Sequence, residues 1–135
     1  QKPLALTGFE MARKFKADKV LAEEASFQYA KIAYDLGRSD QAIDELENFI
    51  NTYTTSDRLV EVKEILSHAY INANNYNKAI EYIESLSRRG PSLDRAYQKA
   101  TYLKGTELFN MERYPEAIAM WEKSVQYPID GALAA

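Results

Sequence analysis

The sequence predicts an all-α protein built from repeated pairs of antiparallel helices. Three observations indicate this class: an alanine recurs in similar surroundings, apolar residues follow it at helical spacing, and a second helical pattern with a turn residue precedes it. The chain has 135 residues, of which 46% are hydrophobic and 27% are charged, which is typical of a soluble globular protein. It is long enough for one short repeat array.

The marker alanine occurs at Ala42, Ala79 and Ala117, at intervals of 37 and 38 residues, with a weaker copy at Ala5. A bulky residue follows four positions later and another residue seven positions later, so that the three side chains share one stripe of a helix. The residues at these two offsets are Phe9, Leu46, Ile83 and Trp121, and then Ala12, Phe49, Leu86 and Ser124. This pattern predicts the second helix of each pair, in which the small alanine allows a neighbouring helix to approach closely.

The first helix of each pair carries a small residue twelve positions before the marker alanine, at Ala30, Ser67 and Gly105. Five positions before the alanine stand Gly37 and Asn74, which suit a left-handed helix C-cap, and then Glu112, which suits it less well. Each unit is therefore expected to be a helix, a tight turn and a second helix.

Taken in order, the predicted helices are 4–15, 19–36, 40–52, 57–73, 76–88, 93–111 and 115–126. Asp18, Ser39 and Ser56 are candidate N-caps, because their side chains can accept an orphan backbone N–H. The chain then divides into a half repeat at 1–17 and repeats at 18–56, 57–92 and 93–130. It begins with Gln1 rather than Met, so we expect it to be a segment of a longer protein.

The pattern resembles the tetratricopeptide repeat. The matching residues are Ala30, Gly37 and Ala42 in the first full unit, Leu66, Ser67, Tyr70, Tyr76, Ala79 and Pro91 in the second, and Gly105, Tyr114, Ala117 and Trp121 in the third. Thr54 stands where the family has proline. The resemblance implies a right-handed alpha-alpha superhelix of about seven antiparallel helices.

The ending Phe49-Ile50-Asn51-Thr52-Tyr53 and the long period are similar to tetratricopeptide proteins of the bacterial cell envelope, of the outer-membrane-assembly or Tol–Pal-associated type. That narrower resemblance implies a periplasmic or outer-membrane-associated location, with the cytoplasm as the alternative.

The resemblance also implies a concave groove lined by the first helix of each pair. The groove residues are Phe27, Lys31, Tyr34, Asp35, Glu64, His68, Asn72, Lys99, Tyr102, Thr106 and Asn110. Phe27 and Tyr102 share a repeat position that we assign to the groove. Tyr34, Ile71 and Phe109 share another, which could equally pack against the adjacent unit. Lysine and asparagine are not arranged as a clamp for a terminal carboxylate requires.

No chemistry beyond binding is predicted. The absence of cysteine excludes disulfides and thiolate metal sites, and the lone His68 with Glu64 supplies two ligands where a metal site needs three or four. Phosphate-binding loops, nucleophile elbows and catalytic triads are absent, so we expect no enzyme and no cofactor. The net charge of -3 comes without a basic stripe, which argues against nucleic acid, and no segment has the roughly 20 apolar residues of a membrane helix.

The predicted function is therefore a protein–protein interaction scaffold that binds a peptide or partner domain in the groove. A passive structural spacer is the alternative. A regulatory arm of an enzyme would need a clustered polar site that the sequence does not offer. Self-association through exposed terminal repeats is also compatible with the sequence.

Overall fold

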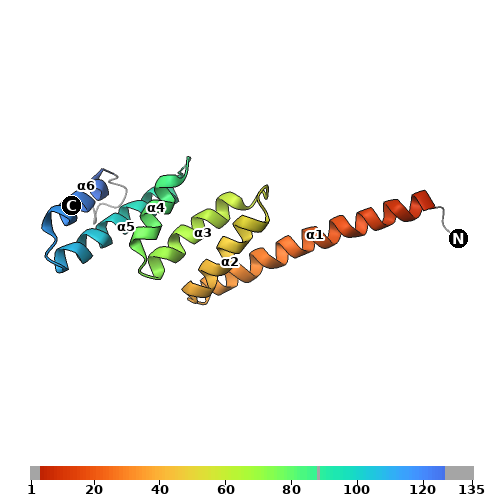
Figure 1. Cartoon of the computed structure of the whole chain (residues 1–135), viewed down its shortest axis with the longest axis horizontal. Helices are drawn as coiled ribbons and strands as arrows, with labels where there is room; N and C mark the ends of the chain where they lie inside the picture. The colour runs from red at the N-terminus through yellow and green to blue at the C-terminus, as the bar shows by residue number, and fades with distance from the viewer. Residues whose placement is uncertain (1–3, 88, 127–135) are drawn as a thin grey trace. The chain divides into compact units, whose positions relative to one another are not determined.

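The computed structural model describes residues 4–87 and 89–126, and within them the chain forms six α-helices and no strand (Figure 1). The helices are α1 (Leu4–Asp35), α2 (Ser39–Thr52), α3 (Leu59–Asn72), α4 (Tyr76–Ser85), α5 (Pro91–Asn110) and α6 (Tyr114–Val125). The predicted all-α class is confirmed. The chain divides into two compact units, residues 1–62 and 63–135, which are described separately.

The first helix differs from the prediction. The expected helices 4–15 and 19–36 are one continuous helix, α1, so the predicted turn between them is wrong and the described residues hold six helices instead of seven. The segment 15–19, Phe-Lys-Ala-Asp-Lys, contains no glycine or proline, and its lysines and alanine favour helix. Asp18, expected as an N-cap, is an exposed residue in the middle of α1.

The first unit is a helical hairpin in which α1 packs against α2. The marker stripe of α2, Ala42, Leu46 and Phe49, is buried, and Ala30 of α1 is buried opposite it. Small side chains at Ala30 and Ala42 let the two helices approach closely. The corresponding side chains at Ala5, Phe9 and Ala12, on which the weakest copy of the repeat rests, lie outside the described residues.

Three helices end in the same left-handed turn. Gly37, Asn74 and Glu112 have φ values of 76°, 60° and 61°. In each case the next residue donates its backbone N–H to the carbonyl five residues earlier: Arg38 to Ala33 at 3.0 Å, Asn75 to Tyr70 at 2.9 Å and Arg113 to Leu108 at 2.9 Å. This is the Schellman motif, and it confirms the predicted C-caps, including the one at which glutamate is a poor choice.

The second unit contains most of α3 together with α4, α5 and α6, and α5 packs against both α4 and α6. Ala79 and Ala117, the marker alanines of α4 and α6, are fully buried. Gln98 and Ser124 join α5 to α6 by two buried hydrogen bonds: the Gln98 amide donates to the Ser124 carbonyl at 3.1 Å, and the Ser124 hydroxyl donates to the Gln98 carbonyl at 3.0 Å. These contacts fix the register of α5 on α6.

A partly buried polar cluster also joins α4, α5 and α6. The Glu84 carboxylate accepts hydrogen bonds from the Tyr97 hydroxyl, at 2.5 Å, and from the Lys123 ammonium, at 3.3 Å. The hydrogen bond from Tyr97 lowers the pKa of Glu84, burial opposes this shift, and Lys123 adds to it.

The remaining helix ends agree with the prediction to within three residues, and the end of α2 at Thr52 and the start of α4 at Tyr76 are as predicted. α2 begins at Ser39 after Arg38, and the Ser39 side chain does not act as the N-cap. Ser56 does serve the start of α3, because its hydroxyl accepts the Arg58 backbone N–H at 3.1 Å. α4 ends at Ser85 instead of residue 88, since Leu86 is already extended. α5 begins two residues early at Pro91, a residue that the first turn of a helix tolerates.

Candidate functional site

The predicted groove residues of the first unit lie on α1, and they differ in exposure. Phe27 is only 2% exposed, and its ring meets the Phe49 ring edge-on, with the ring centroids 6.2 Å apart. The Arg58 guanidinium lies over the same ring, 4.3 Å from its centroid, and pairs with Glu24. Phe27 is therefore a core residue of the hairpin, and its ring is not available to a partner.

The three other predicted residues of α1 are more accessible. Lys31 is half-buried, with its ammonium 3.9 Å from the Glu61 carboxylate. Tyr34 is half-buried, and Asp35, in the last turn of α1, is exposed. The first unit thus brings a basic and an acidic side chain to the surface together with the half-buried Tyr34, whereas the ring of Phe27 is withdrawn into the core.

In the second unit, α3 and α5 carry most of the other predicted residues, and the two helices meet where His68 hydrogen-bonds Ser92. We call this surface the α3–α5 face. From α3 it contains Glu64, His68 and Asn72, and from α5 it contains Ser92, Arg95, Lys99, Tyr102, Thr106 and Asn110. The α5 residues follow one another at spacings of three or four, which keeps them on one side of the helix.

His68 links the two helices of the α3–α5 face. Its Nε2 shares a hydrogen bond with the Ser92 hydroxyl at 3.2 Å. Burial lowers the pKa of His68; the nearby Glu64 carboxylate opposes that shift, whereas Lys99 and Arg95 add to it. The fixed charges around the imidazole are one carboxylate and two cations.

The aromatic residues of this face do not behave alike. Tyr102 is 38% exposed, and its backbone carbonyl accepts the Trp121 indole N–H at 3.2 Å. Ile71 is buried and belongs to the core. Phe109 is 48% exposed although its ring contacts those of Tyr114 and Trp121, at centroid distances of 5.3 Å and 5.7 Å. Tyr102 and Phe109 are thus the aromatic surfaces that this end of α5 offers.

Sequence reasoning did not single out Ser92 and Arg95. Ser92 shares a hydrogen bond with His68, and the charge of Arg95 contributes to lowering the pKa of the His68 imidazole. The signal was present: Ser92, Arg95, Lys99 and Tyr102 follow one another at offsets of three and four, and the last three lie within the predicted helix 93–111. What the sequence could not indicate is that this stripe lies beside His68.

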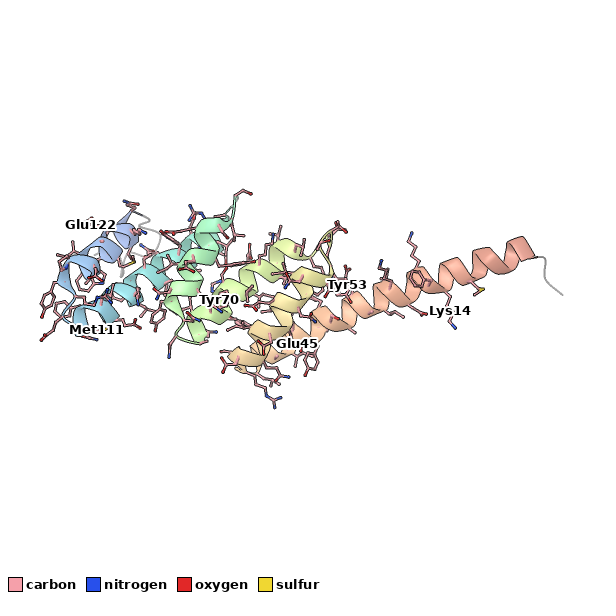
Figure 2. The ribbon with its side chains drawn as sticks, in the orientation of Figure 1. Lys14, Glu45, Tyr53, Tyr70, Met111 and Glu122 are labelled. Carbon is pink, nitrogen blue, oxygen red and sulfur yellow. The ribbon has the colours of Figure 1, made fainter. Side chains whose placement is uncertain are left out.

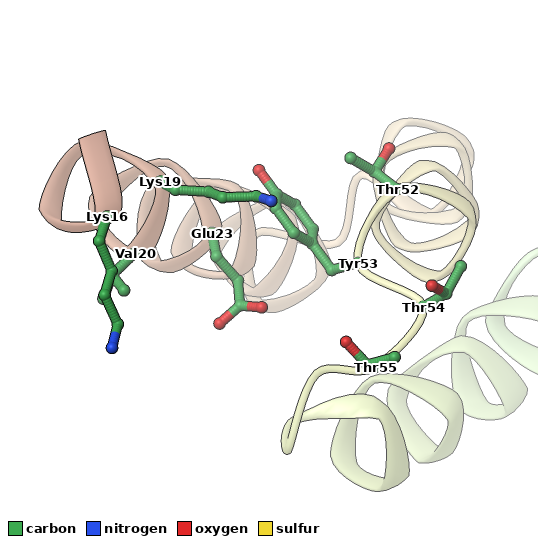
Figure 3. A pocket seen from close by; sticks show the side chains of 8 residues that line it. All are labelled: Lys16, Lys19, Val20, Glu23, Thr52, Tyr53, Thr54 and Thr55. Carbon is green, nitrogen blue, oxygen red and sulfur yellow. The ribbon is translucent and has the colours of Figure 1, made fainter. Parts of the chain in front are cut away.

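A separate pocket of about 390 Å³ lies in the first unit, between α1 and the connection from α2 to α3 (Figure 3). It is open to solvent, and its lining residues are Lys16, Lys19, Val20, Glu23, Thr52, Tyr53, Thr54 and Thr55. All of these are exposed or half-buried, so the pocket lacks a buried polar group that would fix a ligand.

Over residues 4–87 and 89–126, no three histidine, aspartate or glutamate side chains are grouped so that they could hold a metal ion. In the same part of the chain, no helix combines the length and the apolar composition needed to span a membrane.

Comparison with known proteins identifies the repeat. Residues 24–56 and residues 60–88 each match a family model described as tetratricopeptide repeat. These matches support the tetratricopeptide-repeat family for this chain, and its all-α fold of helical hairpins is the fold of such repeats. No curated protein and no solved structure shows a significant match to the chain.

The matched segments fall within the predicted repeats at 18–56 and 57–92. The α5–α6 hairpin lies outside both, yet it shares their features: a buried small residue at Gly105, a left-handed cap at Glu112 and a buried marker alanine at Ala117. Tetratricopeptide repeats generally mediate protein–protein interaction and are generally non-enzymatic scaffolds, which directs attention to partner binding.

Proposed function

We propose that this chain is a protein-interaction scaffold, and that its α3–α5 face binds an extended acidic segment of a partner protein. The proposal is carried by the exposed stripe of Arg95, Lys99 and Tyr102 along α5, which His68 borders from α3. Arginine and tyrosine are enriched among the residues that dominate binding energy at interfaces.

The charge of the face favours an acidic partner. Arg95 and Lys99 supply two positive charges against the single carboxylate of Glu64, whereas the whole chain carries a net charge of -3. The remaining side chains, among them Asn72, Thr106 and Asn110, are neutral and can donate and accept hydrogen bonds. A peptide with carboxylates spaced along it would meet both cations and still find partners for its backbone.

The test is selection of a random twelve-residue peptide library on the 135-residue chain, followed by fluorescence anisotropy with an enriched peptide. We expect acidic peptides, and we expect Lys99→Glu and Tyr102→Ala each to weaken binding about ten-fold or more. Lys78→Glu is the matched control, because Lys78 is an exposed lysine on α4 and not part of the face. Circular dichroism would verify that each variant is folded.

Two outcomes would reject this function. Failure to enrich any peptide would favour the passive spacer, which needs no ligand. Equal loss of binding in Lys99→Glu and Lys78→Glu would show that general electrostatics, and not this face, holds the peptide.

We also propose that the full protein works in the bacterial cell envelope, in an assembly at or near the outer membrane. This rests on the resemblance of the Phe49–Tyr53 ending, whose two aromatic rings pack with their centroids 4.8 Å apart. Fractionation of cells that express the natural protein should place it in the periplasmic or outer-membrane fraction. Recovery with cytoplasmic markers would reject the location without affecting the binding proposal.

A further inference from the structure

An exposed apolar stripe follows α1 over most of its length. Its members are Met11, Phe15, Ala22, Ala25, Tyr29, Ile32 and Leu36. The five large ones are between 51% and 71% exposed. With Asp18 included, the positions alternate at spacings of four and three, which is the seam of a helix that pairs with another helix along its length. We call these residues the α1 stripe.

The α1 stripe borders α2 at Tyr29, whose hydroxyl accepts a hydrogen bond from the Gln41 amide, but its other large members lie away from the side of α1 that α2 buries. Phe27 and Ala30, which are buried in the hairpin, lie about 120° to 180° around the helix from Leu36, at 100° per residue. At 1.5 Å per residue, α1 is about 48 Å long and α2 about 21 Å, so more than half of α1 extends beyond its partner. Figure 1 shows this extension, and Figure 2 shows Lys14 projecting from it.

A helix with no tertiary partner is only marginally stable in water, so the extended part of α1 requires a covering surface. We propose that this surface is a second copy of the chain, whose α1 packs antiparallel on the first along the α1 stripe. The sequence of the stripe is self-complementary about its centre, between Ala22 and Ala25. Antiparallel pairing places Met11 against Leu36, Phe15 against Ile32 and Ala22 against Ala25, each contact occurring twice.

Size and shape match in this register. The large side chains oppose one another toward the two ends, and the two alanines oppose one another at the centre, where the helices must come closest. At the Leu36 end, a small apolar hollow of about 90 Å³ is lined by Tyr29, Ile32, Ala33, Leu36, Arg38 and Gln41. The second copy's Met11 would lie beside it.

Charge is complementary in the same register. Lys14 and Asp35 flank the stripe on one side, both are exposed, and antiparallel pairing sets the Lys14 of each copy near the Asp35 of the other. Asp18, the polar member of the seam, would oppose Tyr29. The Tyr29 hydroxyl accepts a hydrogen bond from the Gln41 amide at 2.6 Å, so its own proton is free to be donated to the Asp18 carboxylate.

Cysteine cross-linking tests both the contact and its direction, because the chain has no cysteine of its own. A mixture of Phe15→Cys and Ile32→Cys chains should form the mixed disulfide dimer on mild oxidation. Phe15→Cys alone should not, because two copies of that position would lie about 25 Å apart, far beyond the roughly 7 Å limit between bridged Cα atoms. Cross-linking of Phe15→Cys alone would indicate parallel pairing and overturn the proposal.

Charge reversal gives an independent test by sedimentation equilibrium of the 135-residue chain. Lys14→Asp should weaken dimerisation about ten-fold, since two attractive pairs become repulsive, and Lys14→Asp/Asp35→Lys should restore it. Lys16→Asp is the matched control, because it makes the same charge change on the opposite side of α1. A chain that stays monomeric at high concentration, or a double variant that is not restored, would overturn the proposal.

Discussion

Trp121 packs against Gly105 in the second unit, and this packing leads to a testable prediction. A Cβ atom placed on Gly105 would lie 2.4 Å from both Cδ1 and Nε1 of the Trp121 ring and 3.0 Å from its Cγ. Carbon atoms make favourable contacts at about 3.5 to 4.0 Å, so the ring must move by more than an ångström in Gly105→Ala. That movement would break the hydrogen bond from the indole to the Tyr102 carbonyl and disturb the Phe109 contact.

The expected effect on the free energy of unfolding is the sum of three contributions. Overpacking of a contact costs about 1 to 3 kcal/mol. Loss of the indole hydrogen bond costs about 1 kcal/mol. Alanine in place of glycine inside a helix raises the free energy of unfolding by about 1 kcal/mol. Gly105→Ala should therefore destabilise the chain by about 1 to 3 kcal/mol, although alanine is the better helix former.

Urea unfolding followed by circular dichroism would measure this loss, and fluorescence would report on the ring directly, because Trp121 is the sole tryptophan. Gly90→Ala is the matched control, since a Cβ at Gly90 meets nothing within 4 Å. In a Trp121→Leu background, Gly105→Ala should become neutral or stabilising. An unchanged or raised stability of Gly105→Ala, with unchanged emission, would refute the steric reasoning.

Three further predictions concern single side chains. Glu112→Gly should raise the free energy of unfolding in urea by about 0.5 to 1 kcal/mol, because φ is 61° at this position and glycine adopts that angle without strain. A lowered free energy of unfolding would show that the Glu112 side chain makes a stabilising contact. Arg58→Ala should lower stability by about 1 kcal/mol, because it removes the contact with Phe27 and the half-buried pair with Glu24. Arg58→Lys should lose less stability, and equal losses in the two variants would exclude the stacking contribution. The folded state should become less stable as pH falls through 6.5, because burial lowers the folded pKa of His68 and the unfolded chain takes up the proton first. His68→Gln should therefore flatten the pH dependence of the urea unfolding midpoint between pH 7.5 and 5.5.

The surface predictions were less successful than the repeat predictions, and particular residues show why. Phe27 and Tyr102 occupy the same repeat position, yet Phe27 is buried beneath Arg58 and Tyr102 remains 38% exposed. The repeat pattern specifies the side of the helix on which a residue lies. It does not specify whether a side chain from the following turn, such as Arg58, folds over that residue.

Asp18 illustrates the other failure. An aspartate can cap a helix or lie inside one, and the choice depends on whether the chain gains more by folding back at that point than by continuing the helix. The predicted turn at 16–18 would have allowed the segment 4–15 to pack on 19–36. The structure instead continues α1 and leaves the α1 stripe exposed.

The sequence by itself determined the all-α class, the period of 37 to 38 residues, the three left-handed caps and the buried marker alanines. These features depend on helical spacing and on local backbone preference, which neighbouring residues carry within one or two turns. Only the tertiary structure decided that α1 is continuous, that Phe27 is core, and that Ser92 and Arg95 lie beside His68. Those facts depend on which side chains from distant segments meet, because contacts between helices are set by packing geometry and not by the periodicity of either helix alone.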